Sequence, residues 1–351
     1  MLTPSIRTSC IRHFVGVLFV LFSLNTAKAQ KIEILQQGKP TSIRGLSVVD
    51  DKIAWISGSK GYIATTTDAG KTWTWQQVKG YEQADFRDIE AFSAKEAVIL
   101  SSGTPALILK TTDGGATWDL KYKNDDKACF LDAMDFADKK HGFILGDPIN
   151  NKFLLLETKD GGNTWNPFKN MPDAIPGEAA FAASGTCLRV DEKSNIDIVT
   201  GGAVARWLIY TAKSKGMQNW TYQGLSIAQG QASKGAFSVA SKKITVFVGG
   251  NYSKDKVTDS VAYIFDPAIT GVKDGFMLSF KGPAGYQSCV EPINDQKSFL
   301  STGTSGSNIT IDGGRNWHQI DATSYNVCRK AKKGNLVILA GDRGKIAIFH
   351  P

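Results

Sequence analysis

The chain is poor in the residues that usually build metal and cofactor sites. Its 351 residues include four histidines and five cysteines, and no two cysteines have C-x-x-C spacing. No G-x-G-x-x-G loop stands at a strand-to-helix turn, and no haem motif or cluster of metal ligands occurs. We therefore expect no metal and no cofactor.

Runs of charge and long apolar runs are scarce as well. The formal net charge is +8, and three of the positive charges lie in the first 29 residues, which hold no acidic residue, so the remainder carries +5. Its lysines are scattered, which excludes the basic stripe that a nucleic-acid-binding protein needs. No segment after residue 29 is apolar enough to cross a membrane.

Residues 1–29 have the pattern of a signal peptide. Arg7 and Arg12 are followed by the short apolar run 14–24, and Ala27-Lys28-Ala29 supplies a small-residue cleavage site. We expect a protein that is exported, either periplasmic or secreted, with residues 30–351 as one mature domain.

An eight-residue pattern, T-x-D-[AG]-G-x-[TN]-W, occurs four times, at residues 66–73, 111–118, 158–165 and 310–317. Its aspartate can accept turn N–H groups while its glycines adopt positive φ, so the pattern predicts a hairpin turn. No second carboxylate follows at the spacing of a calcium loop. We interpret the four aspartates as structural: Asp68, Asp113, Asp160 and Asp312.

The spacing of these turns predicts a ring of repeated units. Helical periodicity is nearly absent, and short strands alternate with turn residues. Two degenerate units fill the gap before the last copy, with Lys213 and Asp266 at the position of the aspartate. A seventh unit lacks its outer strand, and residues 32–36 can supply it by pairing with residues 345–349. The sequence therefore predicts an all-β protein, a seven-bladed β-propeller whose ring is closed by its N-terminal strand.

The candidate site is the ring of residues that precede or begin the innermost strand of each blade. In a propeller these positions converge on one mouth of the central channel, and here they are unusually polar. Arginine suits the recognition of carboxylate, phosphate or sulfate groups. The candidate ligand-binding residues are Arg44, Arg87, Asp88, Asp132, Glu178, Ser184, Tyr286, Gln287, Asn326 and Arg329. The alternative is a polar channel in which Arg–Asp pairs brace neighbouring blades.

Four cysteines follow the signal peptide: Cys129, Cys187, Cys289 and Cys328. Each falls in a strand-like segment, which favours buried single thiols, and a pairing of Cys289 with Cys328 stays open.

The repeated turn resembles the Asp-box, or BNR repeat, of sialidase-like β-propellers. That resemblance implies a glycoside hydrolase in which Arg44, Arg87 and Arg329 bind a substrate carboxylate. Tyr286 with Glu178 would then be the nucleophile pair, and Asp88 or Asp132 the acid. The blade-one segment Ile43-Arg44-Gly45-Leu46 departs from the Arg-Ile-Pro segment of sialidases, and no spacing ties Tyr286 to Glu178.

The sequence is more similar to the Ycf48-type propellers, relatives of photosystem II assembly factors. Those proteins carry TTDGGxTW turns and a G-x-x-G-x-[IV] segment before the third strand, which residues 58–63 match. This resemblance implies a non-enzymatic binding platform. We therefore expect a monomeric scaffold that binds a glycan, another small anionic ligand or a protein partner, with glycoside hydrolysis as the alternative.

Overall fold

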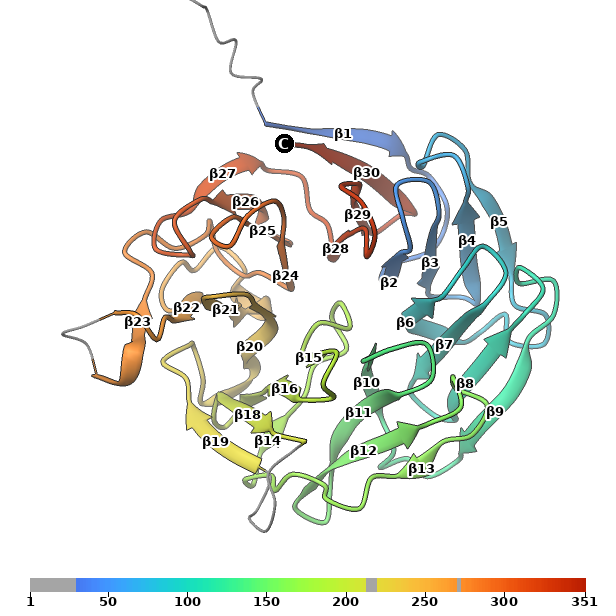
Figure 1. Cartoon of the computed structure of the whole chain (residues 1–351), viewed down its shortest axis with the longest axis horizontal. Helices are drawn as coiled ribbons and strands as arrows, with labels where there is room; N and C mark the ends of the chain where they lie inside the picture. Colours follow the sequence, from blue (N-terminus) through green and yellow to red (C-terminus); the bar gives the residue numbers. More distant parts are fainter. Residues whose placement is uncertain (1–29, 213–219, 270–272) are drawn as a thin grey trace, which may run out of the picture.

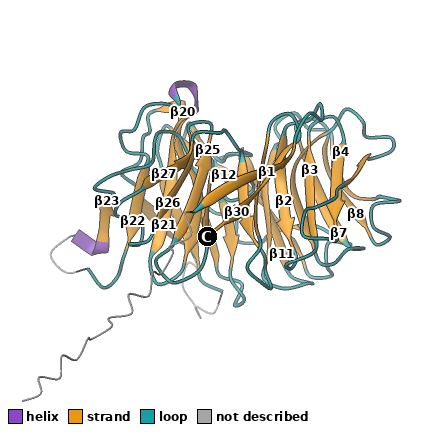
Figure 2. Ribbon diagram, turned by 90° about the horizontal axis from the view of Figure 1, so that it is seen from above, coloured by secondary structure: helices purple, strands orange, loops and turns teal. Residues whose placement is uncertain are grey.

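A computed structural model describes residues 30–212, 220–269 and 273–351 of the chain. Seven sheets stand around a central axis, and one strand of each sheet, here called the first strand of its blade, lies nearest that axis (Figure 1). The sheets pack face to face around the ring (Figure 2). The structure confirms the all-β, seven-bladed propeller.

The first three blades are regular four-stranded antiparallel sheets. Blade one contains β2 (Ile43–Val48), β3 (Ala54–Gly58), β4 (Tyr62–Thr66) and β5 (Thr74–Gln77). Blade two contains β6 (Asp85–Ala91), β7 (Ala97–Ser102), β8 (Ala106–Thr111) and β9 (Asp119–Asn124). Blade three contains β10 (Leu131–Phe136), β11 (Gly142–Ile149), β12 (Lys152–Thr158) and β13 (Asn166–Pro167).

The two degenerate units form blades four and five. Blade four contains β15 (Leu188–Val190), β16 (Ile196–Val199), β18 (Arg206–Tyr210) and β19 (Trp220–Gly224). Blade five contains β20 (Gln231–Ser241), β21 (Thr245–Asn251), β22 (Ala262–Phe265) and β23 (Phe276–Leu278), with the short helices η1 (Tyr252–Lys254) and η2 (Lys273–Gly275). Two short strands extend its sheet, β14 (Glu178–Ala179) and β17 (Gly201–Gly202). The predicted turn position at Lys213 lies outside the described residues.

The last two blades close the ring. Blade six contains β24 (Cys289–Pro292), β25 (Phe299–Gly303), β26 (Gly306–Thr310) and β27 (His318–Asp321). Blade seven contains β28 (Val327–Lys330), β29 (Val337–Gly341), β30 (Lys345–His350) and, as its outer strand, β1 (Lys31–Gln36). Ile32 pairs with Phe349 and Ile34 with Ala347, which confirms the predicted closure.

Apolar clusters between neighbouring blades make up the core. Trp55 of blade one is fully buried and meets Trp118 of blade two edge to face, with ring centroids 6.3 Å apart. Trp317 is buried among residues of blades five and six. The tryptophans of the repeated turns thus pack between blades and supply apolar contact there.

The repeated turns hold their aspartates in one hydrogen-bond pattern. Asp68 Oδ1 accepts from the Thr72 N–H at 2.9 Å and from the Thr66 hydroxyl at 2.8 Å, and its Oδ2 accepts from the Thr72 hydroxyl at 2.6 Å. These bonds, those from Thr72 first, lower the pKa of Asp68 to about 2. Each of the other three aspartates accepts the corresponding bonds within its own turn.

We expect Asp312→Ala to lower the free energy of unfolding by about 1–2 kcal/mol, because three hydrogen bonds from Thr310 and Asn316 are lost. Urea denaturation measures the change. Asp312→Asn, which keeps one acceptor oxygen, is the matched control and should lose less stability than Asp312→Ala. Equal stability of Asp312→Ala and the wild type would refute a structural role for this turn.

The first strand of blade four, β15, begins at Leu188. The residues just before it, 181–187, here called the plug segment, cross the centre of the ring. The Ser184 hydroxyl donates to the Ser288 carbonyl in blade six at 2.7 Å, while Gly185 lies against the Asp88 carboxylate of blade two. The plug segment therefore fills the channel instead of lining it.

Candidate functional site

A cavity of about 460 Å³ opens at one mouth of the channel, on the face where the first strands begin. We call it the funnel. Its lining residues come from the first strands and the residues just before them, from the plug segment, and from the ends of second strands and the loops that follow them: Arg44, Arg87, Phe130, Asp132, Asp147, Ala180, Phe181, Ala182, Ala183, Phe237, Tyr252, Tyr286, Ser288, Thr304, Asn326 and Asp342. Of the ten predicted ligand-binding residues, five line it: Arg44, Arg87, Asp132, Tyr286 and Asn326.

β-Bulges place the side chains at the centre of the funnel. The register of β2 against β3 shifts between Ile43 and Gly45, so Arg44 is the extra residue. The same shift occurs at Arg87 in β6, at Asp132 in β10 and at Phe237 in β20. Because a bulge re-aims the side chain of its extra residue, four blades each direct one residue into the funnel.

The two arginines form a cationic wall. Arg87 Nε lies 2.7 Å from Asp85 Oδ2, and the guanidinium lies 5.8 Å from the centre of the Phe130 ring. Arg44 has no ion pair or hydrogen bond with any residue that the structure describes. Burial and then the positive charge of Arg87 lower the pKa of Arg44 from its usual value. Arg44 is thus a partly buried cation whose donors are free for a ligand.

Asp132 is a buried acid without a partner. The residue is 1% exposed, and neither carboxylate oxygen accepts a hydrogen bond of good geometry within the described part of the chain. Burial and then the negative charge of Asp147 raise the pKa of Asp132 well above its usual value, while Arg87 and the nearby Ala182 amide lower it less. Asp147 accepts from the Ala180 N–H at 3.1 Å, and burial raises its pKa too.

Aromatic rings form the wall contributed by blades five and six and the plug segment. Phe181 stacks on Phe237 with centroids 3.8 Å apart, and Tyr286 meets Phe237 edge to face at 4.8 Å. Tyr252 stands over this group and is 51% exposed. Burial raises the pKa of Tyr286, so its hydroxyl stays neutral.

Four predicted residues have structural partners around the funnel. Asn326 Nδ2 donates to the Ile43 carbonyl at 3.0 Å, and Gln287 Nε2 donates to the Ser305 hydroxyl at 2.8 Å. Ser184 belongs to the plug segment. Asp88 accepts from the N–H groups of Met134 and Ile89, and burial raises its pKa to about 7. Gln287, Ser184 and Asp88 do not line the funnel.

Two predicted residues lie elsewhere. Glu178 is held by Arg206 through bonds of 2.9 and 2.5 Å and lines a different cavity from Tyr286, so the structure does not bring the proposed nucleophile pair together. Arg329 lies at the opposite mouth of the channel, where its Nη1 is 3.9 Å from Glu291 Oε2. The cavities at the two mouths share no lining residue, in agreement with the plug segment between them.

The funnel also uses residues that were not among the predicted site residues, chiefly Phe181, Phe237, Tyr252 and Asp147. Phe237 had a signal in the sequence. It follows the apolar Ala236 in an innermost strand, as Arg44 follows Ile43 and Arg87 follows Phe86. Aligning the repeats at this position would have found it.

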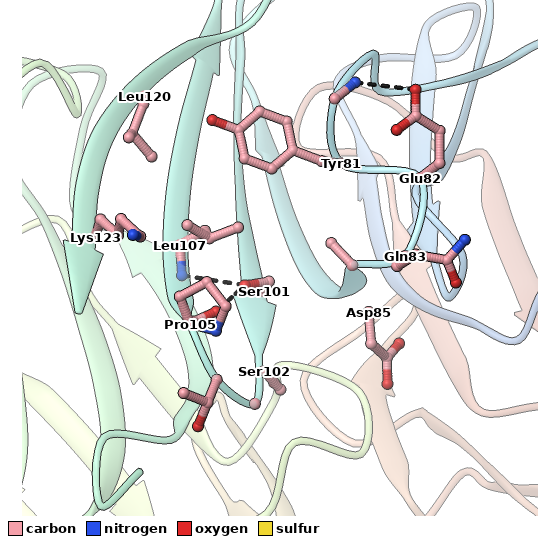
Figure 3. Close-up of a pocket in the computed structure, with 14 residues that line it drawn as sticks. Tyr81, Glu82, Gln83, Asp85, Ser101, Ser102, Pro105, Leu107, Leu120 and Lys123 are labelled. Carbon is pink, nitrogen blue, oxygen red and sulfur yellow. Dashed lines mark hydrogen bonds between the residues drawn. The ribbon is translucent and has the colours of Figure 1, made fainter. Parts of the chain in front are cut away.

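A larger groove of about 710 Å³ lies beside blades one and two on the same face. Figure 3 shows Tyr81, Pro105, Leu107 and Leu120 around it, with Glu82 accepting a hydrogen bond from the Gly80 N–H. Asp85 lines this groove and also binds Arg87 of the funnel. Lys123, the basic residue among the described residues that line this groove, is paired with Asp125, whereas the smaller funnel holds the unpaired Arg44.

We expect Arg44→Gln to raise the free energy of unfolding by a few tenths to about 1 kcal/mol, because it removes an unpaired, partly buried charge that Arg87 repels. Urea denaturation of this variant beside Arg343→Asn, which removes an exposed arginine, measures the difference. A loss of stability in Arg44→Gln would mean that Arg44 braces the fold.

The four cysteines of the described residues, Cys129, Cys187, Cys289 and Cys328, are buried free thiols, and Cys328 Sγ lies 3.7 Å from Cys289 Sγ. Within the described residues, no group of three or more histidine, cysteine, aspartate and glutamate side chains is arranged to hold a metal. No helix in the described ranges has the length and apolar character needed to cross a membrane.

Comparisons with known proteins agree with this fold. Residues 24–127 match the family model described as photosynthesis system II assembly factor YCF48. A structure of YCF48 bound to D1 peptide is 13% identical with a TM-score of 0.64, covering 93% of this chain and 96% of its own. YCF48 from Cyanidioschyzon merolae is 14% identical with a TM-score of 0.63, covering 91% and 99%. The Neurospora crassa Pan2 WD40 domain is 13% identical with a TM-score of 0.54, covering 88% of each chain. No curated protein sequence matches the chain significantly.

Blade number, ring closure and repeats define a seven-bladed β-propeller of the BNR-repeat type. More particularly, its fold is similar to that of the YCF48 structures, and residues 24–127, which include its first two blades, match the model of that family.

Proposed function

We propose that the protein is an exported binding platform whose funnel recognises an anionic group on a partner. Arg44 supports this proposal most strongly, because a partly buried guanidinium without a carboxylate partner is costly for the fold and suited to an incoming carboxylate, phosphate or sulfate. The ring of bulges that holds Arg44 and Arg87 is rigid sheet, which keeps the donors in place before the ligand arrives.

A protein segment is the anionic partner that we favour. The groove beside blades one and two gives apolar contact next to the funnel, and Asp85 connects the two surfaces. An extended acidic segment could therefore place one carboxylate in the funnel and its neighbours in the groove. The structurally similar YCF48 bound to D1 peptide supports a peptide ligand on this fold by analogy only. A glycan with an acidic group is the alternative ligand.

Catalysis is not part of the proposal. A retaining glycosidase needs its acid and nucleophile on either side of one glycosidic bond. Here Glu178 is bound to Arg206, and Tyr286 lines another cavity.

Defined probes test the proposal. We expect an array of acidic decapeptides, presented with sialylated, sulfated and neutral glycans, to retain the protein on acidic peptides. Retention should fall at least about tenfold in Arg44→Gln, which corresponds to about 1.4 kcal/mol of binding free energy. Arg343→Asn removes an equal charge outside the funnel and should bind like the wild type.

The outcomes separate the alternatives. Retention on acidic glycans alone, lost in Arg44→Gln, would make the ligand a glycan. Equal retention of all three proteins would show that the funnel is only a braced channel mouth and would refute the proposal.

A further inference from the structure

The funnel keeps opposite charges apart instead of pairing them. Arg87 binds Asp85, which does not line the funnel, and neither Arg87 nor Arg44 is within ion-pair distance of Asp132. Asp132 nevertheless faces the same cavity as both arginines. Two buried or partly buried groups of opposite charge, each without a partner of its own, match a ligand that carries both charges.

We propose that the funnel binds a zwitterionic group, with its anion on Arg44 and Arg87 and its ammonium on Asp132 beside the aromatic wall. This inference rests on the proposed function and specifies the chemistry of the ligand. A free amino acid has this chemistry, and so does a peptide in which an acidic side chain lies close to an amino group.

Asp132 is the residue that supports binding of an ammonium group. A buried carboxylate without a hydrogen bond of good geometry is destabilising, and its two oxygens provide acceptors for the three N–H donors of an ammonium. Asp147 lines the same cavity and adds a second negative charge. A monoanion would leave these acceptors unused and would add repulsion.

The aromatic wall favours the same ligand. An ammonium is attracted to the faces of aromatic rings within about 6 Å of their centres. Tyr252 is half exposed at the mouth, and Phe181, Phe237 and Tyr286 continue the wall inward. A volume of about 460 Å³ admits a small molecule or one or two side chains, but not a folded domain.

The proposal predicts that ligand binding changes the protonation of Asp132, which can be measured as proton release. Burial and then the negative charge of Asp147 raise the pKa of Asp132 in the free protein, opposed by Arg87 and the Ala182 amide. The other titratable groups that line the funnel are Arg44, Tyr252, Tyr286 and Asp342. An ammonium beside Asp132 favours its carboxylate form and lowers that pKa, so we expect net proton release on binding at a pH where Asp132 is partly protonated. A monocarboxylate on the arginines raises that pKa and releases none.

A series of small probes with matched charges tests this inference. Glycine, 4-aminobutyrate and 6-aminohexanoate carry both charges at increasing separation, while acetate, butyrate and hexanoate carry only the anion, and ethylamine, butylamine and hexylamine only the cation. Isothermal titration in two buffers of different ionisation enthalpy measures affinity and proton release together. We expect at least one amino acid to bind about tenfold or more tightly than its matched acid and amine, with proton release.

Asp132→Asn keeps the shape of the side chain and removes its charge, and a melting curve shows whether it folds. We expect this variant to bind the amino acid no better than the matched acid and to release no proton, whereas Arg343→Asn should behave like the wild type. If the acid binds the wild-type protein as well as the amino acid does, the inference fails and the proposed function stands. If no probe binds but acidic peptides do, the inference fails as well. If neither probes nor peptides bind, both fail.

Discussion

Deletion of residues 30–37 is expected to lower the melting temperature by about 10 °C or more, or to leave the protein insoluble. The deletion removes β1, which pairs with β30 from Lys31–His350 to Gln36–Ile346. Several ladder hydrogen bonds of about 1 kcal/mol each are lost, together with the partial burial of Ile32. A chain of this size loses about 2 °C of melting temperature per kcal/mol of stability. The deletion should therefore lower the melting temperature by more than an ordinary point mutation does.

The deletion also exposes β30 as an unprotected sheet edge, which promotes aggregation. A synthetic peptide of residues 30–37 should restore part of the lost stability when it is added to the shortened protein, because it can pair with β30 in the same register. A scrambled peptide of the same composition is the control. A shortened protein that stays soluble and melts like the intact chain would show that β1 does not close the ring.

Arg206→Ala is expected to lower the free energy of unfolding by about 3–5 kcal/mol, because it leaves a buried carboxylate without its counter-ion. The Glu178 side chain is 0% exposed and accepts two bonds from Arg206, one from the Thr200 hydroxyl and one from the Ile175 N–H. Removing Arg206 therefore leaves the buried Glu178 carboxylate without a counter-ion and without contact with water. Urea denaturation measures the loss.

The double variant Arg206→Ala/Glu178→Gln provides the matched comparison. It removes both charges and should recover part of the stability, since a neutral amide costs less to bury than an unpaired carboxylate. Neither residue lines the funnel, so binding by the folded fraction should stay unchanged. If Arg206→Ala costs less than about 1 kcal/mol, Glu178 is free for another role and its interpretation as a structural residue is wrong.

The repeated turns made most of the fold predictable. Each copy fixes the boundary between third and fourth strands, and the unpaired last unit required an outer strand from the N-terminus. The course of the plug segment was not predictable from residues 181–187 themselves. Their course across the channel depends on contacts with Ser288 and Asp88, which are distant in the sequence.

The sequence predicted the site best at the positions where the first strands of the blades have β-bulges. Arg44, Arg87 and Asp132 occupy matching positions in three successive repeats, and the structure brings all three to the funnel. Arg329 was misplaced because the register of β28 against β29 runs without a shift. Asn326 precedes β28 at the funnel end, and Arg329 is three residues further along the strand, toward the other mouth. Glu178 was misplaced because its partner Arg206 comes from a strand that sequence reasoning did not connect with it.

A crystal structure of the protein with the acidic peptide or glycan that it retains best would test the central claim most directly. The account predicts that an anionic group of this ligand lies within hydrogen-bonding distance of the Arg44 guanidinium, inside the funnel and above the plug segment. A ligand bound on another surface, with Arg44 facing only water, would contradict it.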